Sequence, residues 1–141
     1  MESEELSFFR KKMKDNKIKI TSQRRLIYSI LKNSKSHPTA DEVFQILHQT
    51  NPEISFNTVF TNLRLFVKIG LIHETENFKN AQRYDAVIKE HGHFHCSQCG
   101  KIIDFDLDSV FLKIPEKLLK NFKIKHQKII LSGFCANCYK Q

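Results

Sequence analysis

Apolar residues recur at helical spacing in the first half of the chain, and this pattern predicts three helices. We expect Ser22 to cap the first helix and a Thr39–Glu42 capping box to open the second. The third begins near Ser55 and ends at Gly70, a residue type favoured just after a helix. The apolar positions that carry this spacing are Leu26, Ile27, Ile30 and Leu31 in the first helix, and Val43, Phe44, Ile46 and Leu47, facing inward, in the second.

Strand-like patterns follow the third helix. Residues 71–76 and 81–87 flank the turn-like residues 77–80 and predict a hairpin, so that helices precede a hairpin as in a winged helix-turn-helix. The period then changes to two, with His91, His93 and His95 on one face of a strand. Strands at 102–105 and 128–134 and a helix at 107–121 complete the pattern. We therefore predict an α+β fold with a winged-helix domain at residues 1–86 and a small α/β domain at residues 87–141.

The charge of the chain adds a candidate partner. Its 141 residues carry a formal net charge of +8, which suggests a polyanion such as nucleic acid. The excess is shared equally by the two predicted domains, so the run of basic residues at 10–25 is more informative. That run is interpreted either as a solvated helix face or as a phosphate contact. The acidic start and the lack of a long apolar run exclude a membrane span and predict an intracellular, soluble protein.

The third helix has two different faces. Asn57, Thr61, Arg64 and Lys68 share one stripe, and the opposite stripe is apolar. Arg can bind guanine, Asn can bind adenine, and the methyl group of Thr can contact thymine, so this stripe fits a helix that reads DNA. An ordinary amphipathic surface helix is the alternative, but a position after a capped helix and before a hairpin favours DNA reading. The apolar stripe comprises Val59, Leu63, Phe66 and Val67.

All four cysteines lie in two C-x2-C pairs, Cys96–Cys99 and Cys135–Cys138. Each pair places two thiolates on one turn, and two such turns complete the tetrahedral shell that structural zinc prefers. Two disulfides or a thioredoxin-like pair are the alternatives, and a reducing compartment disfavours both. The sequence therefore predicts a structural zinc site, with no ligand position left open for chemistry.

A second group of metal-ligand residues is separate from the cysteines. His91 and His93 form an H-x-H pair, Asp104 lies on the neighbouring predicted strand, and Asp85 lies at the domain boundary, with His37 far earlier in the chain. Imidazole and carboxylate ligands suit Fe²⁺ or Mn²⁺ as well as Zn²⁺. Ligands drawn from both domains would let metal occupancy control the angle between them.

Three segments together resemble the ferric uptake regulator (Fur) superfamily. They are residues 19–24 (KITSQR), residues 54–63 (ISFNTVFTNL) and residues 91–101 (HGHFHCSQCGK). The resemblance covers almost the whole chain and implies a homodimeric, metal-dependent transcriptional repressor of a double-stranded DNA operator, with the C-terminal α/β domain forming the dimer. The DNA contacts that it implies are Arg24, Asn57, Phe60, Thr61, Asn62 and Arg64.

Within this superfamily the chain is most similar to the peroxide-responsive repressors. That branch implies a regulatory Fe²⁺ or Mn²⁺ site made of His37, Asp85, His91, His93 and Asp104, beside the structural Zn²⁺ site. It also implies that hydrogen peroxide oxidises His37 or His91 when iron is bound. Iron-sensing members usually carry Glu at the two acidic positions and often an acid where this chain has Gly92. The chain departs from the family at Phe60, where Tyr is usual, and at Ser22, where Pro is usual.

Three other functions compete with a peroxide sensor. An iron-responsive repressor of iron-uptake genes would use the same ligands without oxidation. A metal-dependent enzyme would need an open metal position and a substrate pocket, and the helix–hairpin half would have no role in it, so we predict no enzyme. A zinc-stabilised interaction module would keep the cysteine site alone.

Overall fold

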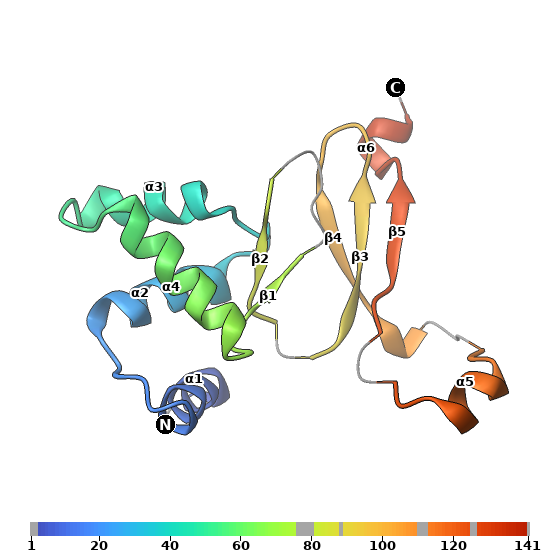
Figure 1. The fold of residues 1–141 in the computed structure, drawn as a ribbon. Helices are drawn as coiled ribbons and strands as arrows, with labels where there is room; N and C mark the ends of the chain where they lie inside the picture. The colour runs from blue at the N-terminus through green and yellow to red at the C-terminus, as the bar shows by residue number, and fades with distance from the viewer. Residues whose placement is uncertain (1–2, 76–80, 88, 110–112, 125–126, 141) are drawn as a thin grey trace. The chain divides into compact units, whose positions relative to one another are not determined.

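The computed structural model describes residues 3–75, 81–87, 89–109, 113–124 and 127–140. The chain divides into two compact units, Met1–Ile88 and Lys89–Gln141, called unit 1 and unit 2 below (Figure 1). Among the described residues, no helix has both the length and the apolar character needed to span a bilayer.

The described part of unit 1 contains four helices, and each begins at a polar N-cap (Figure 1). The caps are Ser3, Thr21, Thr39 and Ser55, and each side chain accepts a hydrogen bond from the backbone N–H three residues further on. Such a bond satisfies one of the N–H groups that a helix start leaves unpaired. The helices are α1 (Glu4–Asp15), α2 (Ser22–Asn33), α3 (Ala40–Thr50) and α4 (Phe56–Lys68).

The predicted helix ends are confirmed in two cases and wrong in one. Both hydrogen bonds of the capping box at Thr39 are present. Gly70 comes directly after the C-cap residue of α4 and has a left-handed φ of 69°. The cap of α2 is Thr21 rather than Ser22, because Thr21 has the extended backbone of a cap and its hydroxyl accepts from the N–H of Arg24 at 3.3 Å. Ser22 is the first residue inside the helix.

One apolar core joins the four helices of unit 1. The ring of Phe9 from α1 stacks on Tyr28 of α2 at 4.9 Å and meets Phe66 of α4 edge-on at 6.2 Å. Such aromatic pairs stabilise a core beyond the area that they bury. Helix α1, which the apolar pattern did not predict, therefore anchors the basic run on the core. Ile46, expected to face inward, is 48% exposed, and α3 buries a narrower stripe of Val43 and Leu47.

The hairpin predicted after α4 is confirmed in a shorter form. Strands β1 (His73–Glu74) and β2 (Tyr84–Asp85) pair antiparallel. Leu71 and Ile72 belong to the core instead, and their N–H groups donate to the carbonyl of Phe66 at the end of α4. The predicted turn at residues 77–80 lies outside the described residues.

Unit 2 is built on a sheet of three strands in which β3 lies between β4 and β5 (Figure 1). Strand β3 (His91–Cys96) pairs antiparallel with β4 (Ile102–Asp106) and parallel with β5 (Ile130–Gly133). The register places His93 opposite Asp104 on one side and opposite Ile130 on the other. These strands confirm the period-two pattern, with the last strand shorter than predicted.

The single helix predicted at residues 107–121 is wrong. The chain instead forms a short 3-10 turn, η1 (Leu107–Ser109), and a separate helix, α5 (Glu116–Asn121), with residues 110–112 outside the described part. Pro115 is the N-cap of α5, and a proline disfavours helical backbone in the residue before it, so the helix cannot extend back through this position. A last short helix, α6 (Ala136–Tyr139), begins directly after Cys135.

Candidate metal centres and nucleic-acid interface

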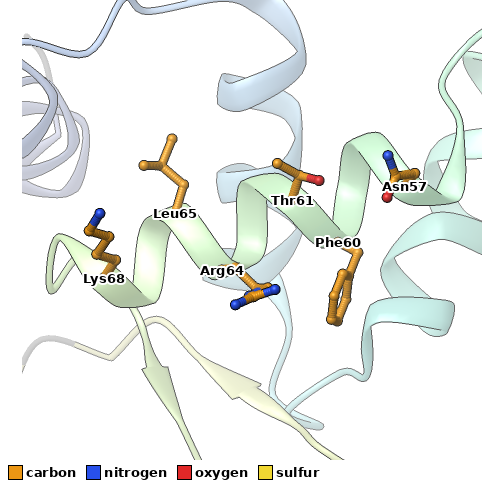
Figure 2. Close-up of a pocket in the computed structure, with 6 residues that line it drawn as sticks. All are labelled: Asn57, Phe60, Thr61, Arg64, Leu65 and Lys68. Atoms are coloured by element: carbon orange, nitrogen blue, oxygen red, sulfur yellow. The ribbon is translucent and has the colours of Figure 1, made fainter.

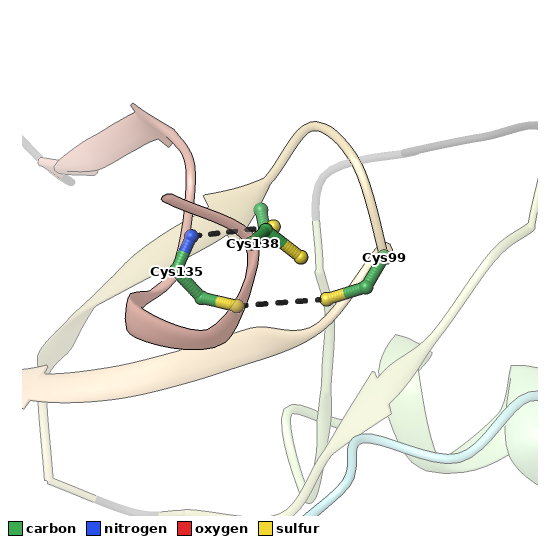
Figure 3. Close-up of side chains that lie close together, drawn as sticks. Cys99, Cys135 and Cys138 are labelled. Carbon is green, nitrogen blue, oxygen red and sulfur yellow. Dashed lines mark hydrogen bonds between the residues drawn. The ribbon is translucent and has the colours of Figure 1, made fainter. Parts of the chain in front are cut away.

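The four cysteines of unit 2 converge on one point. Cys96 and Cys99 lie on the turn that leaves β3, and Cys135 and Cys138 lie at the start of α6, with four sulfur atoms all within 4.8 Å of one another. Cys99 and Cys135 approach to 3.8 Å between their Sγ atoms (Figure 3), well beyond the S–S bond length of about 2.05 Å. All four cysteines are free thiols, so the geometry favours a metal site over disulfides.

Backbone N–H groups prepare two of these sulfurs to bind a cation. The N–H of Cys135 donates to Sγ of Cys96 at 3.3 Å and lowers the pKa of that thiol to about 5. The N–H of Cys138 lowers the pKa of Cys135. The thiol of Cys138 donates to the Cys135 sulfur, and this bond raises the pKa of Cys138 to about 12. Lowered pKa values at Cys96 and Cys135 favour the thiolate form that a divalent metal ion binds.

Two histidines and one aspartate of unit 2 form a second donor cluster. The Nε2 atoms of His91 and His93 lie 3.0 Å apart, and Oδ1 of Asp104 lies 3.6 Å and 3.3 Å from them. Donor atoms bound at right angles to one ion at about 2.1 Å would lie about 3.0 Å apart, so this spacing fits neighbouring ligands of a divalent metal. His91, His93 and Asp104 are thus brought together as the sequence predicted.

The tautomer of His91 is fixed by its surroundings. Nδ1 of His91 lies 2.8 Å from the carbonyl of Lys89, which can only accept, so Nδ1 carries the proton and Nε2 presents its lone pair. This is the arrangement in which an imidazole binds a metal. His95, on the same strand, is 2% exposed, and its ring centroid lies 6.3 Å from that of His93.

Unit 1 holds the other two predicted donors as a pair. Nε2 of His37 and Oδ2 of Asp85 lie 3.5 Å apart, and each side chain is 4% exposed. Oδ1 of Asp85 accepts from the N–H of Val87 at 2.9 Å, which fixes the carboxylate. His37 has a left-handed φ of 51°, a conformation that non-glycine residues rarely adopt and that is found at sites where surrounding contacts enforce it.

The outer face of α4 is the predicted DNA-reading surface. Asn57, Phe60, Thr61 and Arg64 line one groove along this helix together with Leu65 and Lys68 (Figure 2). The guanidinium of Arg64 lies over the ring of Phe60 at 5.9 Å, and Phe60 stacks on Phe56 at 6.1 Å. The cation–π contact orients Arg64 outward on a rigid aromatic support. Val59, Leu63 and Phe66 are buried on the opposite face, as the sequence predicted.

Asn62 and Arg24 differ from the other four predicted DNA contacts. Asn62 is 9% exposed; its Oδ1 accepts from Nε of Arg24 at 3.0 Å, and its Nδ2 donates to the carbonyl of Thr58. Nη1 of Arg24 donates to the carbonyl of Lys19 at 2.5 Å. The pair therefore joins α4 to the basic segment between α1 and α2, and the structure places Asn62 behind the exposed stripe. Its position on α4, one residue after Thr61, could have indicated this.

The fold and these donor clusters define a metal-binding protein with a winged helix-turn-helix. The model of the ferric uptake regulator family matches residues 15–132, and the chain belongs to this family. Its members are transcriptional regulators and not enzymes, so this chain is a regulator as well. The predicted α+β fold is confirmed by the solved structure of the Helicobacter pylori ferric uptake regulator Fur. That structure is 26% identical with a TM-score of 0.76 and covers 98% of this chain and 93% of its own.

Two relatives confirm the resemblance to peroxide-responsive repressors. The peroxide operon regulator of Bacillus subtilis is 36% identical over 100% of this chain and 98% of its own length. The peroxide-responsive repressor PerR of Staphylococcus aureus is 38% identical over 86% of this chain and 82% of its own. The Helicobacter pylori structure is described as having three functional metal-binding sites.

Gly92, between the two histidines of β3, has a packing role. A Cβ atom built on Gly92 would lie 2.2 Å from the ring of Phe105, its partner on β4. That separation is far below van der Waals contact, so no side chain fits between β3 and the Phe105 ring. Any residue larger than glycine at this position would have to displace the Phe105 ring.

We predict that Gly92→Ala lowers the free energy of unfolding by about 1–3 kcal/mol, the usual effect of overpacking. The added methyl group forces the Phe105 ring out of its place against β3. Urea unfolding measures the change, and the second substitution Phe105→Leu in the Gly92→Ala protein should restore much of the loss. The matched control is Gly133→Ala on β5, where the added Cβ would lie 3.7 Å from Phe94. Equal destabilisation by the two alanines would contradict the assignment.

Proposed function

We propose that this chain is a repressor that senses hydrogen peroxide through a regulatory Fe²⁺ or Mn²⁺ ion, with peroxide-stress genes as its targets. The observation that carries the proposal is the donor chemistry of the second cluster. The Nε2 atoms of His91 and His93 lie 3.0 Å apart, and Oδ1 of Asp104 lies 3.3 Å from that of His93. His37 and Asp85 form a second donor pair in unit 1. Imidazole and carboxylate donors suit Fe²⁺ and Mn²⁺. The relatives named for peroxide response support the same conclusion.

On this proposal one ion takes all five donors, two from unit 1 and three from unit 2. Its binding would fix the two units in one relative arrangement and select the form of the protein that binds DNA. Iron would supply the activation of hydrogen peroxide, which none of the side chains can perform. His37 or His91 then gains one peroxide oxygen in its ring C–H bond, while the other peroxide oxygen leaves as water. An oxidised ring is a weaker donor, so the metal and then the DNA are released.

The structural site in unit 2 is proposed to hold zinc. Four converging thiols fill a tetrahedral shell, and zinc brings no redox chemistry to it. The ion would join the turn after β3 to the start of α6, two segments that are already linked by the hydrogen bond from the N–H of Cys135 to Sγ of Cys96.

A homodimer is proposed on the apolar surface of unit 2. Strand β5 lies at the edge of the sheet as the structure describes it, and edge strands and exposed apolar groups are features that proteins cover. The repressor would act on chromosomal DNA in the cytoplasm, with the two α4 helices of the dimer in successive major grooves. Exposed apolar side chains in the described part of unit 2 include Leu118, Leu119, Phe122, Ile124, Leu131 and Phe134.

The peroxide proposal is tested by operator binding. We expect the Mn²⁺-loaded and Fe²⁺-loaded proteins to bind the operator equally, and peroxide to weaken binding of the iron form alone by roughly tenfold or more. Mass spectrometry of the treated iron form should find the mass of one added oxygen atom on the peptide with His37 or the one with His91. The manganese form is the control. Operator binding that follows iron but ignores peroxide would favour the iron-responsive repressor instead.

The zinc proposal is tested by metal content. We expect one tightly held zinc per chain in the purified protein and none in Cys99→Ser, because a shell of three thiolates and a hydroxyl binds zinc weakly. Loss of the ion should also lower the thermal stability of unit 2. Ser97→Ala, an exposed substitution in the same turn, is the matched control and should keep its zinc. Full zinc content in Cys99→Ser would rule out the four-cysteine shell.

The DNA-reading surface is tested at Arg64. We expect Arg64→Ala to weaken operator binding by about 1–3 kcal/mol and to relax sequence preference, the usual effect of losing one base contact. Fluorescence anisotropy with operator and scrambled duplexes, at two salt concentrations, separates a base contact from a phosphate contact. Lys140→Ala, an exposed charge in unit 2, should leave both affinities unchanged. Equal losses on operator and scrambled duplexes would mean that Arg64 contacts phosphate only.

A further inference from the structure

Arg83 lies in unit 1 between a metal-donor residue and the start of a helix. Its Nη1 donates to the backbone carbonyl of His37 at 3.1 Å and lies 3.5 Å from Oε2 of Glu42, with three quarters of the Arg83 side chain removed from solvent. Arg83 directly precedes β2, the short strand that carries the proposed metal donor Asp85.

The backbone around Arg83 is paired with the segment that carries His37. Thr39 and Arg83 form an antiparallel bridge, and the N–H of Tyr84 donates to the carbonyl of Pro38 at 3.0 Å. The carbonyl of Arg83 in turn accepts from the N–H of Thr75. An isolated bridge and the neighbouring hydrogen bond therefore tie Arg83 to the segment that carries His37.

His37 needs such support because its backbone is strained. A φ of 51° in a histidine that precedes a proline is an unfavourable backbone conformation. The charged hydrogen bond from Arg83 to the His37 carbonyl offsets part of this cost. It also fixes the peptide plane next to the imidazole, and thereby the direction in which Nε2 points.

The same guanidinium reaches the start of α3. Glu42 closes the capping box by accepting from the N–H of Thr39 at 2.9 Å, and it is also the carboxylate that pairs with Arg83. Helix α3 packs on α4, the helix with the proposed DNA-reading face. Arg83 thus contacts both the His37 peptide and Glu42 at the start of α3, the helix that packs on α4.

We propose that Arg83 is a positioning residue for the regulatory metal, holding His37 in its left-handed conformation and tying it to the N-terminus of α3. The inference rests on the proposed function, because it takes His37 as a metal donor. Arg83 would not touch the ion. It acts through His37, so its contribution to metal binding should disappear when the imidazole is removed.

The test is a double-mutant cycle read as the Kd for Mn²⁺ alone, with the full-length, zinc-containing protein. We expect Arg83→Met to weaken Mn²⁺ binding by roughly tenfold, as the loss of a partner of a ligand does. In the His37→Ala protein the same substitution should change the Kd little, a result that a general loss of stability would not give. Arg83→Lys, which keeps the charge near Glu42 but loses the planar donor, covers the case in which Arg83→Met does not fold.

The controls distinguish a failure of the Arg83 role from a failure of the proposed metal site. Arg25→Met removes an exposed arginine of the same unit and should leave the Kd unchanged. If His37→Ala weakens Mn²⁺ binding but Arg83→Met and Arg83→Lys do not, the role of Arg83 is overturned and the proposed metal site stands. If His37→Ala itself has no effect on the Kd, the five-donor site is wrong, and the inference falls with it. Equal losses from Arg83→Met with and without His37 would make Arg83 merely structural.

Discussion

The register between β3 and β4 is the constraint on which the donor cluster of unit 2 depends. His93 lies opposite Asp104 in this register, and a slip of one residue would turn every side chain of one strand to the other face of the sheet. The Phe105 ring, seated against Gly92, opposes such a slip because only a glycine leaves room for it. The strand register and the contact between Gly92 and the Phe105 ring thus hold three donor atoms at the spacing of metal ligands before any ion binds. This reduces the reorganisation that binding requires.

Helix α4 meets two demands with separate sets of residues. Val59, Leu63 and Phe66 are buried in the core of unit 1, and the groove residues face outward on the opposite side. Asn62 lies between the two sets and uses its amide to hold Arg24, so a polar residue is buried without losing its hydrogen bonds. The outward face can therefore differ among related repressors with little effect on the core, which is how one fold accommodates different operators.

The fold was predictable from the sequence where local chemistry decides it. The capping box at Thr39 and the glycine after α4 are local signals, and both elements were found as predicted. Helix α1 was missed because only Phe9 and Met13 of its residues are fully buried, and its many charges hide that stripe. The break at Pro115 was missed because apolar spacing outweighed a proline signal that was present in the sequence.

The candidate site was also predictable from the sequence only in part. Metal-ligand residue types and their spacing indicated both donor clusters, since few structures other than metal sites use two C-x2-C pairs or an H-x-H pair with nearby aspartates. Arg83 could not be found by sequence analysis, because its contact with the His37 segment depends on a bridge to Thr39, which lies far away in the chain. The resemblance implied Asn62 as a DNA contact because it lies on the predicted DNA-reading helix. The sequence alone does not show that its side chain is buried.

The positions of the two donor clusters along the chain explain why one metal can be structural and the other regulatory. All four cysteines belong to unit 2, so binding free energy at that shell stabilises a single folded unit. The proposed regulatory donors come from both units, so the free energy of binding is available to select one arrangement of the units over others. A strained donor suits that task, because a ligand whose conformation is costly binds well only while its support is intact. The hydrogen bond from Arg83 to the His37 carbonyl would then set how tightly the regulatory ion is held, independently of the zinc shell.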